Sequence, residues 1–179
     1  MSSDTEISKF LSYALRHAPG KVGIELDSGG WTELNTLLAR LHANGLNCDE
    51  ARIRRVVDES PKKRFAISED GSKIRANQGH SINVELGLEP LAPPSVLYHG
   101  TALTSLPAIR VDGLKRMKRH HVHLSSDKAT ALAVGQRHGK PGILSIDAQG
   151  MYARGYEFFC SENGVWLTAL VPVEFIVFP

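Results

Sequence analysis

The first twenty residues place apolar side chains at a helical period. The apolar positions, which share the spacing of one face of an α-helix, are Ile7, Phe10, Leu11, Ala14 and Leu15. Pro19 and Gly20 follow, and a helix seldom continues far through such a pair. We therefore expect an amphipathic helix that ends by presenting the guanidinium of Arg16 beside the imidazole of His17.

The pattern as far as residue 76 predicts two more helices and some extended structure. The expected elements are a strand at 22–27, a helix capped by Thr32 that stops near Gly45, a helix capped by Asp49, and a hairpin of 65–67 and 73–76 around Asp70-Gly71. Three helices followed by a β-ribbon are typical of a winged helix. Such modules often bind nucleic acid, but a fold alone does not establish a function.

A proline-rich segment separates this part of the chain from the rest. Residues 89–94 contain Pro90, Pro93 and Pro94, so we expect a semi-rigid linker rather than a central strand or a helix interior. The domains expected are therefore 1–88, the linker 89–94, and 95–179.

The second domain is expected to be mostly β with two helices. Its expected strands cover 96–99, 121–124, 143–146, 156–160, 165–168 and 175–178, and its helices run from about 103 to 111 and from a cap at Ser125 or Ser126 to about 138. Together the two patterns predict an α+β fold.

Composition narrows the class of protein. Hydrophobic residues make up 42% and charged residues 22%, which is ordinary for a globular protein. No apolar run approaches the roughly 20 residues that a membrane helix needs. The first residues lack the basic flank and apolar core of a signal peptide, so a cytoplasmic protein is expected.

Charge is nearly balanced overall but locally uneven. The net charge is +2, too small for a general polyanion binder. Residues 115–121 nevertheless form a basic run without an acidic residue, and residues 52–64 form a second basic region interrupted by Asp58 and Glu59. Each region alone is explained by solvated surface. Two of them on one chain favour an anionic partner such as nucleic acid.

Cysteine and histidine spacing gives no metal site. Cys48 and Cys160 are far apart, and in a reducing compartment we expect two free thiols. His120, His121 and His123 have no acidic or thiolate partner nearby, so no metal is expected. The sequence has neither a P-loop nor a GxGxxG motif, the two usual nucleotide cradles.

Several polar residues are candidates for chemistry, each with a structural alternative. Residues 98–101 put a histidine and a glycine at a strand end, where a ligand can approach the backbone, although a buried histidine at a turn explains them equally well. His121 and His123 fall on one face of a strand, as binding residues or as a polar surface. Arg137 lies at a helix end, where the helix dipole alone favours a cation. Arg75 by itself is an ordinary exposed arginine.

The combination is more specific than its parts. The motifs occur in the order Arg16-His17, Arg75 with Gly79-His80-Ser81, His99-Gly100-Thr101, His123-Leu124-Ser125 and Gly135-Gln136-Arg137-His138-Gly139. This set resembles the RNA 2′-phosphotransferase family (KptA, the tRNA splicing 2′-phosphotransferases) over nearly the whole chain. The resemblance implies an N-terminal winged-helix RNA-binding lobe and a C-terminal ADP-ribosyltransferase-like lobe that binds NAD.

The resemblance also implies a two-step reaction and its partners. An internal RNA 2′-phosphate attacks the anomeric carbon of NAD and expels nicotinamide, giving 2′-phospho-ADP-ribosylated RNA. The ADP-ribose 2″-hydroxyl then attacks the phosphodiester, which frees 2′-hydroxyl RNA and ADP-ribose 1″,2″-cyclic phosphate. The partners implied are 2′-phosphorylated RNA and NAD, which is consumed, with no metal and no membrane. We expect a monomer.

Roles for residues follow by similarity. Arg16, His17, Arg75 and Arg137 are assigned to the 2′-phosphate and its transition states, mainly in step two, because arginine offers forked, permanently charged donors. His17 is either the general acid or only a hydrogen-bond donor. The motif residues expected to bind NAD are His99, Gly100, Thr101, His123, Leu124, Ser125 and Gly135.

Two points stay open at this level. Many members of the wider superfamily carry a glutamate in a third motif, where Val165 stands here and Glu162 lies nearby. Two other functions are possible: an ADP-ribosyltransferase that caps phosphorylated nucleic-acid ends, and a non-catalytic winged-helix regulator that senses NAD. The 2′-phosphotransferase hypothesis also requires that four side chains reach one phosphate: Arg16, His17, Arg75 and Arg137.

Overall fold

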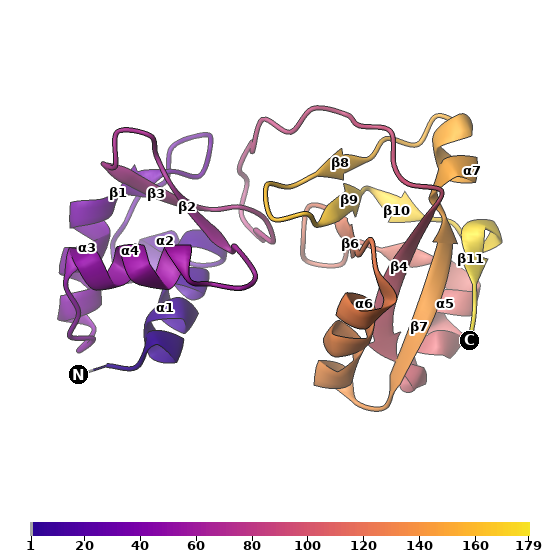
Figure 1. The fold of residues 1–179 in the computed structure, drawn as a ribbon, viewed down its shortest axis with the longest axis horizontal. Coiled ribbons are helices and arrows are strands. Elements are labelled where there is room, and N and C mark those ends of the chain that lie inside the picture. The colour runs from indigo at the N-terminus through magenta and orange to yellow at the C-terminus, as the bar shows by residue number, and fades with distance from the viewer. Residues whose placement is uncertain (1) are drawn as a thin grey trace. The chain divides into compact units, whose positions relative to one another are not determined.

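The computed structural model describes residues 2–179 and divides into two compact units. The first unit ends at Gly87 and the second covers Leu88–Pro179. Both combine helices with small antiparallel sheets (Figure 1), which confirms the α+β class. No helix within residues 2–179 has both the length and the hydropathy to cross a membrane.

The first unit is built from helices and one three-stranded sheet. Its elements are α1 (Asp4–Arg16), α2 (Pro19–Val22), β1 (Thr32–Glu33), α3 (Leu34–Ala43), α4 (Glu50–Asp58), β2 (Phe65–Ile67) and β3 (Lys73–Ala76). The sheet has the order β1-β3-β2, and both pairings are antiparallel.

Helix α1 begins and ends where its sequence predicts. Ser3 and Glu6 form a reciprocal capping box at its start. Ile7, Leu11 and Leu15 are fully buried in the core of the first unit. The helix ends at Arg16, and His17 is its C-cap. The predicted cap at Asp49 is also confirmed, because its side chain accepts a hydrogen bond from the backbone N–H of Arg52 at 2.8 Å.

Two predictions for the first unit are wrong. Residues 22–27 form no strand: Val22 ends α2, and Gly23 follows in the left-handed region at φ 76°. The alternation of apolar and polar residues there reflects the burial of Val22 and Ile24, but the segment does not pair with another strand. Thr32 caps no helix either, since it pairs with Ile74 in β1, and α3 begins two residues later.

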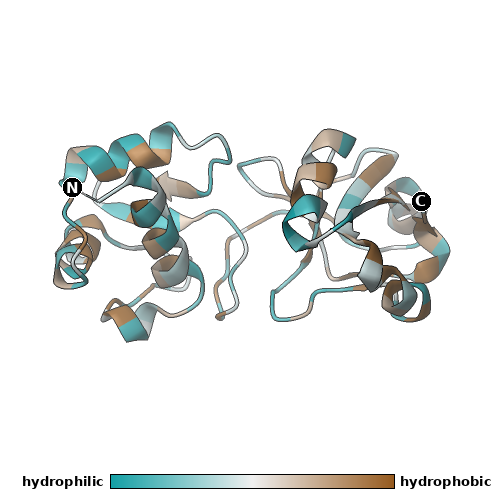
Figure 2. Cartoon of the chain, turned by 90° about the horizontal axis from the view of Figure 1, so that it is seen from below, coloured by the Kyte–Doolittle hydropathy of each residue, from teal (hydrophilic) through white to brown (hydrophobic). Residues whose placement is uncertain are grey.

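The second unit contains three short helices and three small sheets. Its elements are β4 (Val96–Ala102), η1 (Leu103–Ser105), α5 (Leu106–Asp112), β5 (Leu114–Lys115), β6 (Val122–Leu124), α6 (Lys128–Gly135), η2 (Gln136–His138), β7 (Pro141–Asp147), α7 (Ala148–Ala153), β8 (Phe159–Cys160), β9 (Trp166–Thr168), β10 (Leu170–Val171), η3 (Val173–Phe175) and β11 (Ile176–Val177). The sheets have the orders β11-β7-β4, β6-β9-β8 and β10-β5. Figure 2 shows apolar and polar residues mixed along the helices of both units, as amphipathic packing requires.

The second unit also corrects the sequence-based picture. Helix α7 was not expected, and α6 is capped by Asp127, whose side chain accepts from the backbone N–H of Thr130 at 2.7 Å, rather than by Ser125 or Ser126. Residues 89–94, which are expected as a linker, contain no helix or strand, and the Leu91 N–H donates to the Phe158 carbonyl at 2.8 Å. The division of the chain at this segment stays a prediction.

Candidate active-site residues

Arg16 is half-buried and its side chain lies along the start of β2. Its Nη2 donates to the carbonyl oxygen of Arg64 at 3.2 Å, and its guanidinium carbon lies 5.6 Å from the centre of the Phe65 ring. These contacts hold the guanidinium against the ribbon of β2 and β3. The end of α1 is therefore joined to the hairpin through the arginine itself.

His17 is exposed and is held by a residue far along the chain. Its Nδ1 lies 2.9 Å from Ser81 Oγ, and the Ser81 N–H donates to the Arg16 carbonyl oxygen at 2.9 Å. The segment after β3 thus returns to the end of α1. The structure brings together two motifs, Arg16-His17 and Gly79-His80-Ser81, that the sequence only places in order.

Arg75 stands on β3, opposite Ala66 of β2. Its guanidinium carbon lies 4.6 Å from the centre of the Trp31 ring, a cation–π contact. Trp31 was not singled out from the sequence, where it is only a tryptophan after two glycines. Arg75 is therefore on the same ribbon that Arg16 contacts, with an aromatic face against it.

His99 lies on β4 and its tautomer is fixed by its neighbour. Its Nδ1 donates to the carbonyl oxygen of His123 at 2.9 Å, because a carbonyl can only accept. Burial lowers the pKa of His99 from its usual 6.5, the hydrogen bond to His123 raises it, and electrostatic interaction with Arg119 and His138 lowers it further, so that the net shift is downward. The ring is therefore neutral at pH 7, and Nε2 carries a lone pair that accepts a hydrogen bond.

His123 on β6 has a partner of its own. Arg119 Nη1 lies 3.2 Å from His123 Nδ1 and donates to it, since an arginine has no acceptor. His121, which was expected on the same strand face, precedes β6 and instead places its ring 5.6 Å from that of Phe159. The two histidines therefore have different surroundings.

Strands β4 and β6 meet at the candidate NAD motifs. Tyr98 and Ser125 exchange two backbone hydrogen bonds, each 2.8 Å long. Ser125 is thereby fixed next to His99, while Leu124 is buried in the core. Thr101, farther along β4, is also buried.

The two motif glycines are sites of close packing. A Cβ on Gly100 would lie 1.6 Å from the carbonyl oxygen of Ala131 in α6, and a Cβ on Gly135 would lie 3.0 Å from the carbonyl oxygen of Thr101. The backbone of α6 occupies the space that a side chain at position 100 would take. Close packing of α6 on β4 therefore requires glycine at position 100.

Arg137 is placed differently from the other candidate phosphate ligands. It lies in η2, directly after α6, and is exposed. Its side chain makes no hydrogen bond or ion pair with any of residues 2–179. Val165 is half-buried and its N–H donates to Ser161 Oγ at 3.2 Å, whereas Glu162 is exposed in the turn between β8 and β9.

The structure thus forms two groups of candidate residues, one in each unit. Arg16, His17 and Arg75 belong to the first, and His99, Thr101, His123 and Ser125 to the second, with Arg137 on η2. Cys48 and Cys160 are both free thiols, as expected. Within the described part of the chain, no three His, Cys, Asp or Glu side chains are grouped as for a metal ion.

Known proteins match this chain along nearly its whole length. A model of the family described as "RNA 2′-phosphotransferase, Tpt1 / KptA family" matches residues 2–170. A probable RNA 2′-phosphotransferase of Agrobacterium fabrum is 55% identical over 96% of this chain and 92% of its own. Proteins of the same description from Burkholderia lata and Acaryochloris marina are 53% and 52% identical, each over 96% of this chain and over 89% and 94% of their own.

Proposed function

The chain belongs to the RNA 2′-phosphotransferase family, and we propose that it uses NAD to remove an internal 2′-phosphate from RNA. The observation that carries the proposal is the joining of Arg16-His17 to Ser81 and to the ribbon that bears Arg75. These contacts place a guanidinium and an imidazole side by side at the end of α1, next to the ribbon. The chain is 55% and 53% identical to proteins described as probable RNA 2′-phosphotransferases.

Each unit is assigned one lobe of the expected architecture. We assign the first unit to a winged helix, since α1, α3 and α4 accompany the hairpin of β2 and β3. We assign the second to an ADP-ribosyltransferase-like lobe, since β4 and β6 meet where His99, His123 and Ser125 stand.

The donor set of the second unit suits a dinucleotide. The Nε2 of neutral His99 is an acceptor for a ribose hydroxyl, because Nδ1 is already committed to His123. The half-buried ring of His123 offers a flat face for the nicotinamide, with its orientation held by Arg119. NAD supplies an anomeric carbon whose bond to a cationic nicotinamide breaks without an acid.

The first step requires orientation more than proton transfer. A phosphate monoester is already anionic, so one of its oxygens forms the bond to the anomeric carbon as the bond to nicotinamide breaks. Nicotinamide leaves as a neutral molecule. No strong base is needed, so this step does not require a glutamate in the third motif, which falls at Val165 or a neighbouring residue.

The second step is where the cationic residues matter most. The 2″-hydroxyl loses its proton and forms a bond to phosphorus, while the bond between phosphorus and the RNA 2′-oxygen breaks. Arg16, Arg75 and Arg137 stabilise the charge on the phosphoryl oxygens. His17 is the one of the four that can supply the proton that the departing 2′-oxygen takes up near pH 7.

The experiment that tests this function is incubation of the protein with NAD and a 2′-phosphorylated oligonucleotide. We expect nicotinamide release together with conversion of the RNA to its 2′-hydroxyl form. A 2′-phosphate that stays intact after incubation with folded protein contradicts the proposal. Stable ADP-ribosylated RNA without cyclic phosphate indicates instead the capping activity considered above.

A further inference from the structure

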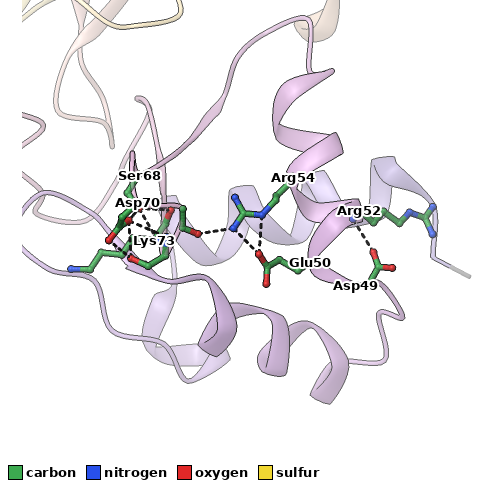
Figure 3. A network of polar contacts seen from close by, with 9 residues as sticks. Asp49, Glu50, Arg52, Arg54, Ser68, Asp70 and Lys73 are labelled. Atoms are coloured by element: carbon green, nitrogen blue, oxygen red, sulfur yellow. Dashed lines mark hydrogen bonds and ion pairs between the residues drawn. The ribbon is translucent and has the colours of Figure 1, made fainter.

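The two basic regions of the sequence differ in how much of their charge is available. In the first unit, the cations of residues 52–64 are largely engaged within the unit. Arg52 pairs with Asp4 at 2.9 Å, and Arg54 pairs with Glu50 at 2.6 Å and donates to the Gly71 carbonyl at 2.7 Å. Figure 3 shows Arg54 turned toward Glu50 in this network. This region is therefore substantially neutralised by its own surroundings.

The second basic region forms a loop, residues 116–120, between β5 and β6. Arg116 and Lys118 are exposed, and neither side chain makes a hydrogen bond or ion pair with any part of the chain from Ser2 to Pro179. Lys115, at the base of the loop, is paired with Asp112 at 3.1 Å. The loop thus carries two cations whose charge is not offset by a carboxylate.

The loop is anchored at both ends and beside the candidate NAD motif. Strand β5 pairs with β10, and β6 pairs with β9. Within the loop the Arg119 N–H donates to the Arg116 carbonyl at 3.0 Å, and the Arg119 side chain reaches His123 Nδ1 at 3.2 Å. The free cations are therefore presented from a defined turn next to His123, and not from a chain end.

An apolar side chain stands between the two free cations. Met117 is 83% exposed and adopts a left-handed backbone with φ 54°. A flexible, polarisable methionine between two cations suits a strand in which phosphates alternate with bases. The pyrophosphate of NAD is polar and has no apolar surface that could pack against an exposed methionine.

We propose that the loop of residues 116–120 is an RNA-binding surface that holds the backbone of the substrate strand outside the nucleotide that reacts. The proposal rests on the proposed function only in taking RNA as the substrate. Arg116 and Lys118 contact two phosphodiesters, and Met117 packs against a base. Because these contacts do not involve the 2′-phosphate, they depend on the length of the RNA and not on its modification.

The test measures binding of an unmodified, fluorescently labelled single-stranded RNA of twelve nucleotides without NAD, by anisotropy over a range of salt concentrations. The variant is the double substitution Arg116→Gln and Lys118→Gln. The matched control is Arg55→Gln with Lys63→Gln, which removes the same charge from exposed positions of the other basic region, where Arg55 lies 3.8 Å from Asp4 and Lys63 donates to the Asp58 carbonyl. All substituted side chains are exposed, and thermal melting checks that each variant is folded.

We expect the loop variant to bind about tenfold more weakly at 0.1 M salt and the slope of log affinity against log salt to fall by about 1.4, since each phosphate contact with a single strand contributes about 0.7. The control is expected to lose less than half as much. Equal losses in both variants, or no loss in the loop variant, overturn the proposal. A loop variant that keeps its RNA affinity but has a raised KM for NAD also overturns the proposal, because the loop then binds NAD.

The outcome is separable from that of the proposed function. Turnover of a 2′-phosphorylated RNA dinucleotide is expected to stay within about twofold in the loop variant, because an RNA of two nucleotides has a single phosphodiester and cannot fill both phosphate contacts of the loop. The KM for a long 2′-phosphorylated strand is expected to rise in proportion to the lost affinity. Absence of turnover in the parent protein contradicts the proposed function alone. Unchanged binding of the unmodified strand by the loop variant contradicts the RNA-binding proposal for the loop and does not affect the proposed function.

Discussion

Replacing Gly100 by alanine is expected to unfold the region that carries the candidate NAD motifs. The added Cβ would lie 1.6 Å from the Ala131 carbonyl oxygen, with the Ala131 carbon at 2.6 Å and the Gly135 nitrogen at 2.9 Å. Ordinary carbon–oxygen contacts are about 3.3 Å or longer, so α6 must move away from β4 by well over an ångström. All three atoms belong to the backbone, and no side-chain rotation relieves the clash.

The size of the effect follows from this geometry. Overpacking costs about 1–3 kcal/mol when side chains can adjust, so a backbone clash is expected at about 3 kcal/mol. For a unit of about 90 residues each kcal/mol lowers Tm by about 4–8 °C, which gives a fall of at least 12 °C for the second unit. Thermal unfolding measures it, and hydrogen exchange of residues 96–102 and 128–135 locates it.

Gly20→Ala is the matched control for this substitution. No atom lies within 4 Å of a Cβ built on Gly20, and alanine at a position whose backbone accommodates it stabilises by about 0.4–1 kcal/mol. A Gly100→Ala protein as stable as its parent refutes the packing explanation. If that stable protein also stops consuming NAD, glycine at this position serves ligand approach instead.

Three further predictions concern the chemistry. His17→Ala and Arg137→Ala each slow step two more than step one, so 2′-phospho-ADP-ribosylated RNA accumulates on a gel; its absence in both counts against the phosphate assignments. The pKa of His99 is lowered from 6.5 in the folded protein, so as the pH falls the unfolded chain binds a proton at this histidine before the folded chain does. The free energy of unfolding is therefore unaffected by His99 above pH 6.5 and decreases below it. An NMR titration that gives His99 a pKa above 6.5 contradicts this. Glu162→Gln leaves nicotinamide release within about twofold, and a loss of a hundredfold or more assigns Glu162 to the third motif.

Local signals predicted the elements that depend on local chemistry. Helix α1 has an apolar stripe and a proline beyond its end, α4 has an aspartate cap, and the β2–β3 hairpin has the turn at Asp70-Gly71, and all three form where expected. Strand β1 escaped prediction because two residues carry no periodicity and its pairing with β3 is a tertiary contact. The strand predicted at residues 22–27 is wrong because alternate burial of side chains gives the same alternation of apolar and polar residues, whether or not the segment pairs with another strand.

The candidate site could be predicted as residue types but not as contacts. The sequence indicates Arg16-His17 and Gly79-His80-Ser81 as two separate motifs, and only the fold joins them, since His17 and Ser81 are 64 residues apart. Trp31 and Arg119 were missed as partners of Arg75 and His123, because a cation–π contact and a hydrogen bond across a loop have no fixed spacing. The demand that Arg16, His17, Arg75 and Arg137 reach one phosphate stays a prediction.

The central claim is the transfer of an RNA 2′-phosphate to NAD, and mass spectrometry of one reaction tests it most directly. The protein is incubated with NAD and an oligonucleotide that carries a single internal 2′-phosphate. The account predicts equal amounts of nicotinamide, 2′-hydroxyl RNA and ADP-ribose 1″,2″-cyclic phosphate. Nicotinamide release without loss of the 2′-phosphate, or loss of the phosphate in the absence of NAD, contradicts it.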